Sequence, residues 1–494
     1  MTRFSQSSFL TGPPQPLILT MDRQGKTPFD IYCLTASPSQ PSFLLDSGKG
    51  ATGESRYSFI GSDPFSVLTG QQGQACLRTR DGHEETSNNP FDSLCRLFDG
   101  PQIGSVPGLP PFQGGAVGYF SYDLVRDFES LPSTAKDDLS IPHVQFGLYD
   151  LITAIDHQSS NLQIMFCPPL KRFLGESRET LYREGLERLA EWKAKLCRRP
   201  APRTDIPSLD QMAFVPDQTR ESYIKEVGRC QEYIAAGDIY QANLSHRFTL
   251  LPPDAYNNSR DRQPYEQEFY RRLQAVNPSP FSGLLHFDEV TLISSSPERL
   301  VRLHNRHADT RPIAGTRPRG LDTRDDQRLI DELLANEKER AEHLMLVDLE
   351  RNDLGRVCQF GSVRVDEFMA IEQYSHVSHI VSNVSGTLRP DATPFDLIRA
   401  LFPGGTITGV PKIRCMEIIE ELEPVRRGPY TGSLGYIGWN GSLDLNIIIR
   451  TLVWCQGKGH LQVGAGIVAD SDPAKEYEET IQKAQAFFSA LQRI

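Results

Sequence analysis

The sequence predicts an α+β fold in which large antiparallel sheets are backed by helices. Residues from about 27 to 170 form mainly short apolar segments separated by turn residues, which is the pattern of successive strands. Strand and helix patterns then follow one another to the C-terminus, but too irregularly for a doubly wound parallel sheet.

The strands expected in the N-terminal half are five apolar segments: FLLDSG, RYSFIGS, GGAVGYFSYDLV, HVQFGLYDLITAID and NLQIMFC. A helix is expected over about 177–198, where apolar residues recur near helical spacing at Leu181, Leu186, Leu189 and Trp192. A second helix is expected over about 219–236, and Gly237 ends it.

The stretch RRPAPRTDIPSLDQMAFVP separates these two helices and is rich in proline and polar residues, as linkers are. We therefore divide the chain into an N-terminal domain over residues 1–198, a linker over 199–216 and a second domain over 217–494.

The composition is that of an ordinary globular protein, with 38% hydrophobic and 23% charged residues. The net charge of -11 argues against nucleic acid or an anionic membrane as the main partner. No stretch reaches the roughly 18 apolar residues that a membrane span needs, and the N-terminus is a poor signal peptide. Nine cysteines without paired spacing fit reduced thiols in a cytoplasm.

Two pairs of carboxylates with the spacing Glu-x-x-Glu are the most informative local feature. Glu339 and Glu342 form one pair and Glu476 and Glu479 the other, each in a segment expected to be helical. Residues three apart lie on one helical face, about 5–6 Å apart, and Lys483 extends the second face.

An isolated pair of this kind is more often a solvated acidic face. Here the first pair runs directly into the apolar HLMLV, and the second follows the buried-looking strand GAGIVADSDP. Together the pairs would make an oxygen-rich site for Mg²⁺, which takes one or two carboxylates plus substrate oxygens and waters.

Several longer motifs occur in order over residues 237–480: GDIYQANLS, SSSPERL, RPIAGTRPRG, AEHLMLVDLERNDLGRV, PGGTITGVPK, RGPYTGSLGYIGWNGSLDLNIIIRT and VGAGIVADSDPAKEYEET. They resemble the chorismate-utilising family, which includes anthranilate, aminodeoxychorismate, isochorismate and salicylate synthases. FLLDSG, RYSFIG and GYFSYDLVRDFE extend the resemblance to the first two types, in their component I. It implies a two-subdomain architecture like that of anthranilate synthase component I, with residues 217–494 binding chorismate.

By this resemblance Glu342 and Glu479 would hold Mg²⁺ directly, while Glu339 and Glu476 would support its waters. Arg450 would pair with a substrate carboxylate, a geometry that suits a guanidinium. The remaining implied contacts to chorismate are the amides of Gly464 and Gly466, Lys483, Tyr430, Thr406 and His379.

These residues also have structural interpretations. His379 is nearly as well explained as an ordinary core or surface histidine, and Gly464 and Gly466 could mark a bulge or turn. Arg450 is harder to explain in this way, because an arginine in the apolar LNIIIRT requires a partner.

The implied reaction adds a nucleophile to the chorismate ring with loss of the ring hydroxyl. The family assigns the general acid to the Glu of SPERL, here Glu298, for which pairing with Arg299 on the surface is the alternative. Members that add water have a lysine base where this chain has Gln241, so the chain resembles members that add ammonia.

The position of amination is contested by two sets of residues. QANLS, NPSPFSG, GSLGYIGWNG, LDLNIIIRT and ADSDP resemble the aminodeoxychorismate type, which leads to 4-aminobenzoate and folate. Ala314 in PIAGT resembles the anthranilate type, because many aminodeoxychorismate synthases carry a nucleophilic lysine there. We expect 4-amino-4-deoxychorismate as the product, with anthranilate as the alternative and an inactive regulatory subunit as the least favoured reading.

Anthranilate synthases bind tryptophan near an LLES motif, and this chain has LLDS, ending in Asp46 and Ser47. Asp46 keeps a carboxylate for an ammonium group, but Phe281 and Ser282 replace the YM of the anthranilate-type NPSPYMF. We therefore expect no strong tryptophan inhibition and, if tryptophan binds, a structural role for it.

No segment resembles a glutaminase, so ammonia is expected from a separate glutamine amidotransferase subunit or from free ammonium. No lyase segment is fused at the C-terminus either, so release of 4-aminobenzoate would need a separate aminodeoxychorismate lyase.

Overall fold

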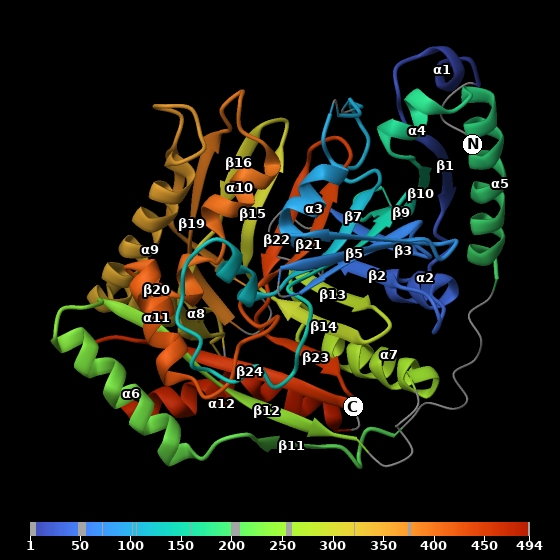
Figure 1. Ribbon diagram of the computed structural model, residues 1–494. Coiled ribbons are helices and arrows are strands. Elements are labelled where there is room, and N and C mark those ends of the chain that lie inside the picture. The colour runs from blue at the N-terminus through green and yellow to red at the C-terminus, as the bar shows by residue number, and fades with distance from the viewer. Residues whose placement is uncertain are drawn as a thin grey trace.

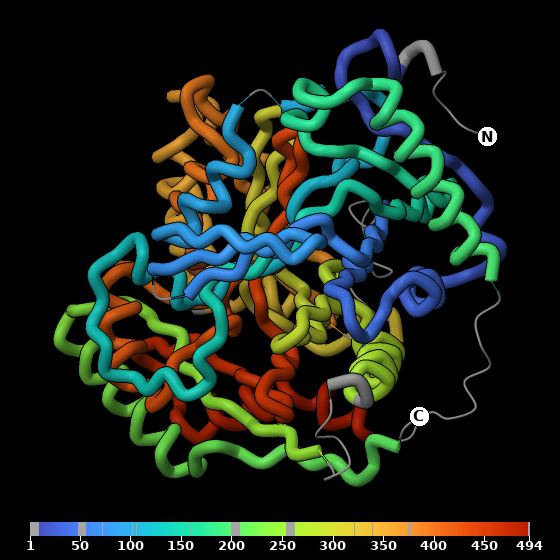
Figure 2. Tube along the Cα trace, turned by 45° about the vertical axis from the view of Figure 1, so that its right-hand side comes forward, coloured from blue at the N-terminus to red at the C-terminus, as the bar shows by residue number. Residues whose placement is uncertain are grey.

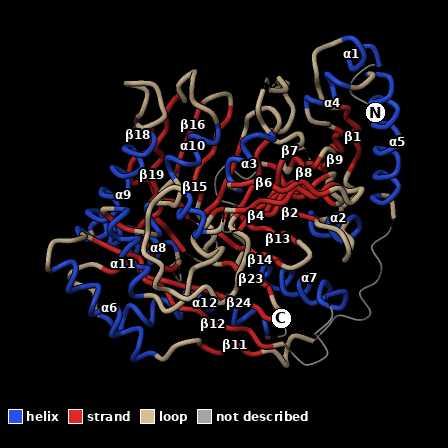
Figure 3. Tube along the Cα trace, viewed as in Figure 1, coloured by secondary structure: helices blue, strands red, loops and turns tan. Residues whose placement is uncertain are grey.

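A computed structural model describes residues 6–47, 56–71, 73–100, 102–104, 106–159, 161–198, 208–252, 259–320, 322–373 and 377–492. Its strands form two 12-stranded sheets in which neighbouring strands pair antiparallel. Figure 3 shows the strands in the middle of the molecule and most helices on the outside. The predicted α+β class is therefore confirmed.

The first sheet joins both ends of the chain. Its order is β1 (Leu17–Asp22), β10 (Asn161–Phe166), β9 (Leu151–Asp156), β3 (Tyr57–Ser62), β2 (Ser42–Asp46), β13 (Phe281–His286), β14 (Val290–Ser296), β23 (Thr451–Cys455), β24 (Lys458–Ile467), β12 (Gln241–Leu251) and β11 (Ala213–Pro216), with β20 (Gly409–Val410) also paired to β12.

The second sheet has the same mixed origin. Its order is β17 (Ile313–Pro318), β19 (Val377–Thr387), β16 (His307–Thr310), β15 (Arg299–His304), β22 (Leu443–Ile447), β21 (Ser433–Gly438), β7 (Gly115–Phe120), β8 (Val144–Tyr149), β4 (Ser66–Gln71), β5 (Gln74–Thr79) and β6 (Glu84–Asn88), with β18 (Arg364–Gln373) also paired to β19.

Each sheet crosses the boundary drawn between the two sequence domains. Strand β2 pairs with β13 in the first sheet, and β7 pairs with β21 in the second. The two segments therefore share one pair of sheets. Residues 199–207 of the linker lie outside the described part of the chain, and its end, Ala213–Pro216, is a strand because it pairs with β12.

The helices cover the outer faces of these sheets. They are α1 (Gln6–Thr11), α2 (Pro28–Thr35), α3 (Pro90–Leu97), α4 (Leu170–Gly175), α5 (Arg178–Leu196), α6 (Arg220–Ala235), α7 (Ser259–Val276), α8 (Thr323–Ala335), α9 (Glu337–Gly355), α10 (Pro394–Leu401), α11 (Lys412–Leu422) and α12 (Pro473–Leu491). In Figures 1 and 2, α5 lies outside β1 and β10, against which it packs. No helix in the described part of the chain combines the length and apolar character that crossing a bilayer requires.

The two helices predicted over about 177–198 and 219–236 are confirmed as α5 and α6. Ser177 and Thr219 cap α5 and α6 by accepting backbone N–H groups with their side chains, and Gly237 follows α6 with a φ of 82°. Two of the five predicted strands are too long. HVQFGLYDLITAID contains two strands, β8 and β9, which belong to different sheets. In GGAVGYFSYDLV only Gly115–Phe120 is a strand, and Tyr122–Asp127 form a 3-10 helix, η1, stabilised by an Arg126–Asp123 ion pair.

Aromatic side chains fill the space between the two sheets. Phe43 of the first sheet contacts Tyr149 of the second, with ring centroids 4.7 Å apart, and Phe59 contacts Tyr436 at 5.5 Å. Such edge-on ring contacts are favourable beyond the apolar area that they bury. They fix the position of β21, and through its partner β22 the strand end that leads to Arg450.

A buried ion pair holds the irregular segments near the end of β12. The Arg427 and Glu423 side chains are 1% and 3% exposed, with an N–O distance of 2.7 Å. The guanidinium also donates to the backbone oxygens of Ile407, at 2.8 Å, and Asn243, at 2.7 Å. Arg427 therefore links α11, η3 (Gly405–Ile407) and β12.

We expect Arg427→Leu to lower the free energy of urea-induced unfolding by about 3–5 kcal/mol, because it leaves the Glu423 carboxylate buried without its cation. The matched control is Arg364→Leu, which breaks an ion pair with Asp366 whose side chains are 70% and 34% exposed. That control should cost at most about 1 kcal/mol. Equal losses in the two variants would contradict the structural role of Arg427.

Candidate active site

The candidate site lies where α9, η3 and the first turns of α12 meet the two sheets. Helix α9 packs against η3, β17 and β19, β12 packs against η3, and α12 packs against β24. These contacts bring together predicted residues from distant segments: Gln241, Glu298, Thr406, Arg450 and Lys483.

Glu298 is the buried acid of this site. It is 6% exposed, and burial raises the pKa of its carboxyl to about 7 because the carboxylate loses its hydration. Thr406, the backbone N–H of Ile313 and the cations Arg450 and Lys483 lower the pKa in opposition. Near neutral pH a large fraction of Glu298 is therefore protonated, as a general acid must be.

Arg450 is a cation without an anionic partner. In the described ranges no ion pair or hydrogen bond joins its guanidinium to the protein, and the residue retains some accessible surface. Burial lowers its pKa, and the neighbouring Glu298 opposes that shift. A guanidinium in this setting favours an anionic ligand, because burying an unpaired charge is costly.

Two further predicted residues lie near these groups: Lys483 lies near Glu298, and His379 lies near Arg450. The Lys483 Nζ donates to the Gly464 carbonyl at 2.9 Å and lies 2.8 Å from a Glu479 oxygen. His379 Nδ1 is 2.9 Å from the Thr316 hydroxyl. Burial, with a contribution from Arg450, lowers the pKa of His379 to about 4, so this histidine is neutral near pH 7.

Gly464 and Gly466 lie next to each other in the row of β24 that faces the site, and neither has a side chain to cover the backbone. Ser245 and Asn243 of β12 lie opposite them in the register. The Gly464 carbonyl bonds to Lys483, and the Asn243 N–H and carbonyl bond to Thr408 and Arg427, so these opposed pairs do not bond to each other. The N–H groups of both glycines therefore point away from β12, where they can donate to a carboxylate.

The side chains of Tyr430 and Gln241 lie close to these two glycines. A Cβ atom on Gly464 would lie 2.8 Å from the Tyr430 hydroxyl, and one on Gly466 would lie 2.8 Å from Gln241 Nε2. Any larger residue would displace these predicted contact residues, which explains why glycine occupies both positions.

The two predicted carboxylate pairs do lie on helices, α9 and α12. Glu339 pairs with Arg317 at 2.8 Å, and its Oε2 is buried without a hydrogen-bond partner in the described structure. Within the same ranges no three His, Cys, Asp or Glu side chains lie close enough together to hold a metal ion. Mg²⁺ needs only one or two protein carboxylates, and the unpartnered Glu339 oxygen suits a group that supports metal-bound water. Mg²⁺ binding by Glu342 and Glu479 stays a prediction.

Glu350 is a second buried acid, which the sequence motifs did not single out. It is 4% exposed, and burial, followed by the charge of Asp353, raises its pKa to about 8. Glu298 also raises it, so the two acids lie within electrostatic reach. The spacing contained a signal, because Glu350 follows Glu339 by eleven residues, about three helical turns, and shares its face.

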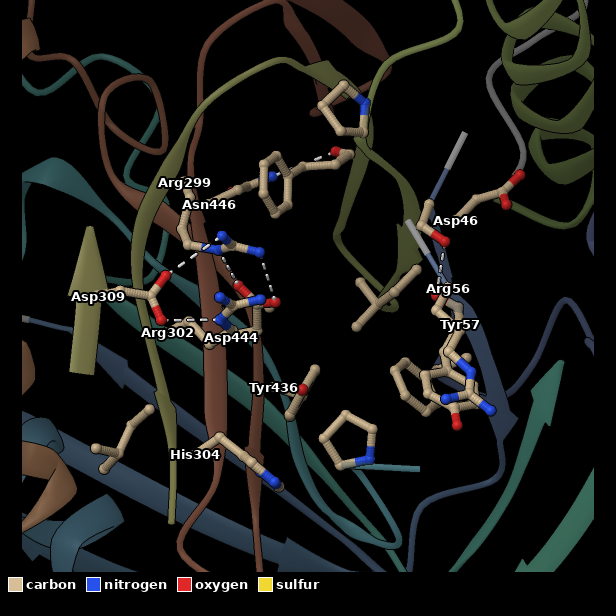
Figure 4. Close-up of a pocket in the computed structure, with 18 of the residues that line it drawn as sticks. Asp46, Arg56, Tyr57, Arg299, Arg302, His304, Asp309, Tyr436, Asp444 and Asn446 are labelled. Carbon is tan, nitrogen blue, oxygen red and sulfur yellow. Dashed lines mark hydrogen bonds and ion pairs between the residues drawn. The ribbon is translucent and has the colours of Figure 1, made fainter. Parts of the chain in front are cut away.

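A separate cavity of about 760 Å³ contains Asp46 and Ser47. Figure 4 shows Asp46 and Tyr57 on one side of it and Arg299, Arg302 and Asp444 on the other. Arg299 follows Glu298 directly, so the cavity and the candidate active site are on opposite sides of the same chain segment.

The charged groups of this cavity are paired within the protein. Asp46 accepts hydrogen bonds from Ser58 at 2.7 Å and Tyr270 at 3.4 Å, and burial raises its pKa. Arg299 lies 3.0 Å from Asp444. The structure thus brings the predicted residues to a cavity, while tryptophan binding there stays a prediction.

Comparison with known proteins identifies the class to which this site belongs. The chorismate binding enzyme family matches residues 40–489, a range that includes every predicted site residue. The chain therefore belongs to this family of chorismate-utilising enzymes.

The individual relatives carry two different names. Aminodeoxychorismate synthase component 1 of Bacillus subtilis is 43% identical over 453 residues, which are 91% of each chain. Anthranilate synthase component 1 of Acetivibrio thermocellus is 39% identical over 484 residues, 97% of this chain and 95% of that one. The structure of anthranilate synthase component I from Streptococcus pneumoniae matches with a TM-score of 0.74 at 32% identity, covering 87% of this chain and 92% of that chain.

We expect Arg450→Met to raise the pKa of Glu298 above its wild-type value near 7, because the guanidinium favours the carboxylate. Infrared difference spectra recorded across neutral pH would follow the carboxyl band, which Glu298→Gln should remove. An unchanged or lowered pKa in Arg450→Met would show that the two groups do not interact.

Proposed function

We propose that this protein aminates chorismate with ammonia in the presence of Mg²⁺, giving 4-amino-4-deoxychorismate. The unpaired Arg450 guanidinium carries the proposal, because it gives the interior a site for a substrate carboxylate. The N–H groups of Gly464 and Gly466 on β24 supply further hydrogen-bond donors for a carboxylate. Chorismate has two carboxylates, so an acidic protein can bind it through these few local donors and the metal.

The buried acid supports the bond-breaking step. The ring hydroxyl leaves as water when it receives the Glu298 proton, while ammonia forms the new C–N bond. The resulting ammonium group then returns one proton to the Glu298 carboxylate, so chorismate and ammonia give the aminated product and water. Gln241 cannot deprotonate water, and this favours ammonia as the nucleophile.

Glu342 and Glu479 would hold Mg²⁺, and Glu339 and Glu476 would support its waters. The ion would neutralise the ring carboxylate of chorismate and so orient the ring. The unpartnered oxygen of Glu339 is the structural observation that supports this assignment.

The choice of product rests on the motifs of the chain. QANLS, GSLGYIGWNG and ADSDP favour 4-amino-4-deoxychorismate. Ala314 favours anthranilate instead, since β17 offers only a methyl group where a covalent route would need a lysine. Aminodeoxychorismate formation by this protein therefore requires direct addition of ammonia. We further propose that a separate glutamine amidotransferase supplies the ammonia in the cell.

The product test incubates the protein with chorismate, Mg²⁺ and ammonium, with and without added aminodeoxychorismate lyase. We expect 4-aminobenzoate only in the sample with lyase, resolved by chromatography. Fluorescent anthranilate formed without lyase would show instead that Ala314 marks an anthranilate synthase.

The metal assignment predicts that Glu342→Ala and Glu479→Ala each lose at least about 100-fold in Mg²⁺-dependent turnover, because a lost carboxylate also misplaces the substrate. Circular dichroism should show both variants folded. The control is Glu478→Ala, which removes a neighbouring carboxylate that is 60% exposed on the same helix. Full activity in either test variant would contradict the assignment.

A further inference from the structure

We propose that Glu350 is a positioning residue for the general acid Glu298, because the two buried carboxyl groups titrate as one coupled pair. The coupling keeps a proton on Glu298 above neutral pH, where more of the ammonia is in its free, nucleophilic form. The inference rests on the proposed amination and adds a second acid to its site.

Glu350 lies on the side of α9 that packs against η3. The residue is 4% exposed, and its Oε1 atom is 3.5 Å from the position that a Cβ atom on Gly405 would take. Its other oxygen, Oε2, is buried without a hydrogen-bond partner in the described part of the chain. A negative charge on such an oxygen is costly, because no donor stabilises it. The geometry therefore favours the protonated, neutral form of Glu350.

Two short segments connect Glu350 to Glu298. The first runs from the end of β16 to the start of β17, where the Thr310 side chain hydrogen-bonds to Glu350 and the Ile313 backbone N–H donates to Glu298. The second is η3, which lies beside Glu350 and whose Thr406 is among the groups that lower the pKa of Glu298. The same pieces of backbone therefore hold both carboxyl groups in place.

The two acids also respond to each other's charge. Burial raises the pKa of Glu350 to about 8, and the charge of Asp353 adds to this shift. Lys412 opposes it, and since Lys412 pairs with Asp353 at 2.6 Å, the effects of these two charges partly cancel. Ionised Glu298 raises the pKa of Glu350 further. Because the repulsion between two carboxylates is reciprocal, ionised Glu350 raises the pKa of Glu298 in the same way.

Other charged groups near the pair have separate roles. Arg450 and Lys483 face Glu298 and lower its pKa, His379 of β19 is neutral near pH 7, and η3 carries no charged side chain. Ion pairs occupy charged side chains on further elements packed against α9: Arg317 with Glu339, Arg328 with Asp325, Arg399 with Asp92, Arg311 with Glu367 and Glu372, and Arg364 with Asp366. We therefore assign the ionisation near neutral pH in this region to Glu298 and Glu350.

The coupling has a definite sign. A coupled pair loses its protons in two steps that belong to the pair and not to either residue alone. The first proton leaves near pH 7 and the second near pH 8, and in this range part of the protein carries the charge on Glu350 and the proton on Glu298. Glu298 therefore remains an acid to a higher pH than it would beside a neutral group. Free ammonia increases as the pH rises, so the acid and the nucleophile coexist over a wider range.

The test variant is Glu350→Gln, which keeps the size of the side chain but cannot ionise. With rates normalised to free ammonia, we expect kcat to stay within about twofold of wild type at about pH 6.5 and to fall about 3-fold below it at about pH 8.5. The KM for chorismate should stay unchanged, because Glu350 acts through Glu298 and is not among the predicted substrate contacts.

Two further variants complete the design. Glu350→Asp restores a carboxyl group and should recover part of the activity at the higher pH. Asp348→Asn is the matched control, because it removes a carboxylate from the same helix whose side chain is 74% exposed and pairs with Arg351 at the surface. The pH profile of this control should match that of the wild-type protein.

Infrared difference spectra of the free protein give a second measurement that does not depend on turnover. The wild-type carboxyl bands should titrate in two steps, near pH 7 and near pH 8. Glu350→Gln should leave one step for Glu298, with its midpoint lowered by about half a pH unit. Glu298→Gln should move the Glu350 step below pH 8, because the charge that raises it is gone.

The outcomes separate this inference from the proposed function. An unchanged Glu298 titration in Glu350→Gln would overturn the pair, and so would an equal loss of kcat at both pH values, which a purely structural role predicts. If the wild-type protein forms no aminated product, the proposed function fails, and the infrared titration alone then decides whether the two acids are coupled.

Discussion

The Arg450 guanidinium lies among the two sheets without an anionic partner in the described structure, and much of the site is organised around it. It lowers the pKa of Glu298 and of His379, although burial dominates both shifts. A buried cation such as this guanidinium is stabilised when an anionic ligand binds to it. The same constraint explains the glycines on β24, because a carboxylate that pairs with Arg450 needs close access to backbone donors.

The rigidity of this site comes from groups that never touch the substrate. Arg427 binds Glu423 and the carbonyls of Ile407 and Asn243, so one buried side chain holds both η3 and β12 in place. Polar groups with full sets of partners, such as Arg427 and Glu423, therefore lie next to side-chain oxygens that have no partner in the described structure. This arrangement holds the backbone of Gln241 and Asn243 in place, although their side-chain oxygens have no partner in the described structure.

The second cavity contrasts with the active site in its charges. Asp46, Arg299 and Asp444 are paired inside the protein, whereas Arg450 is not. Glu298 and Arg299 are successive residues that belong to the two different regions. Arg299 begins β15 and Glu298 directly precedes it, so their side chains point to opposite sides, as successive side chains of extended backbone do.

The sequence by itself determined the fold class, the two capped helices and most of the candidate site. Helical spacing and N-cap residues are local signals, so α5 and α6 could be predicted within two residues at each end. The motifs located Glu298, Arg450 and the glycines, because their chemistry is recognisable along the chain.

Only the tertiary structure decided how these parts combine. The division into sequence domains did not reveal that both halves share both sheets, because strand pairing joins residues hundreds of positions apart. The burial that makes Glu298 and Glu350 weak acids, and the missing partners of Arg450 and Asn243, likewise depend on neighbours from other segments. Desolvation and hydrogen-bond satisfaction are properties of the packed environment, and one segment of sequence does not contain them.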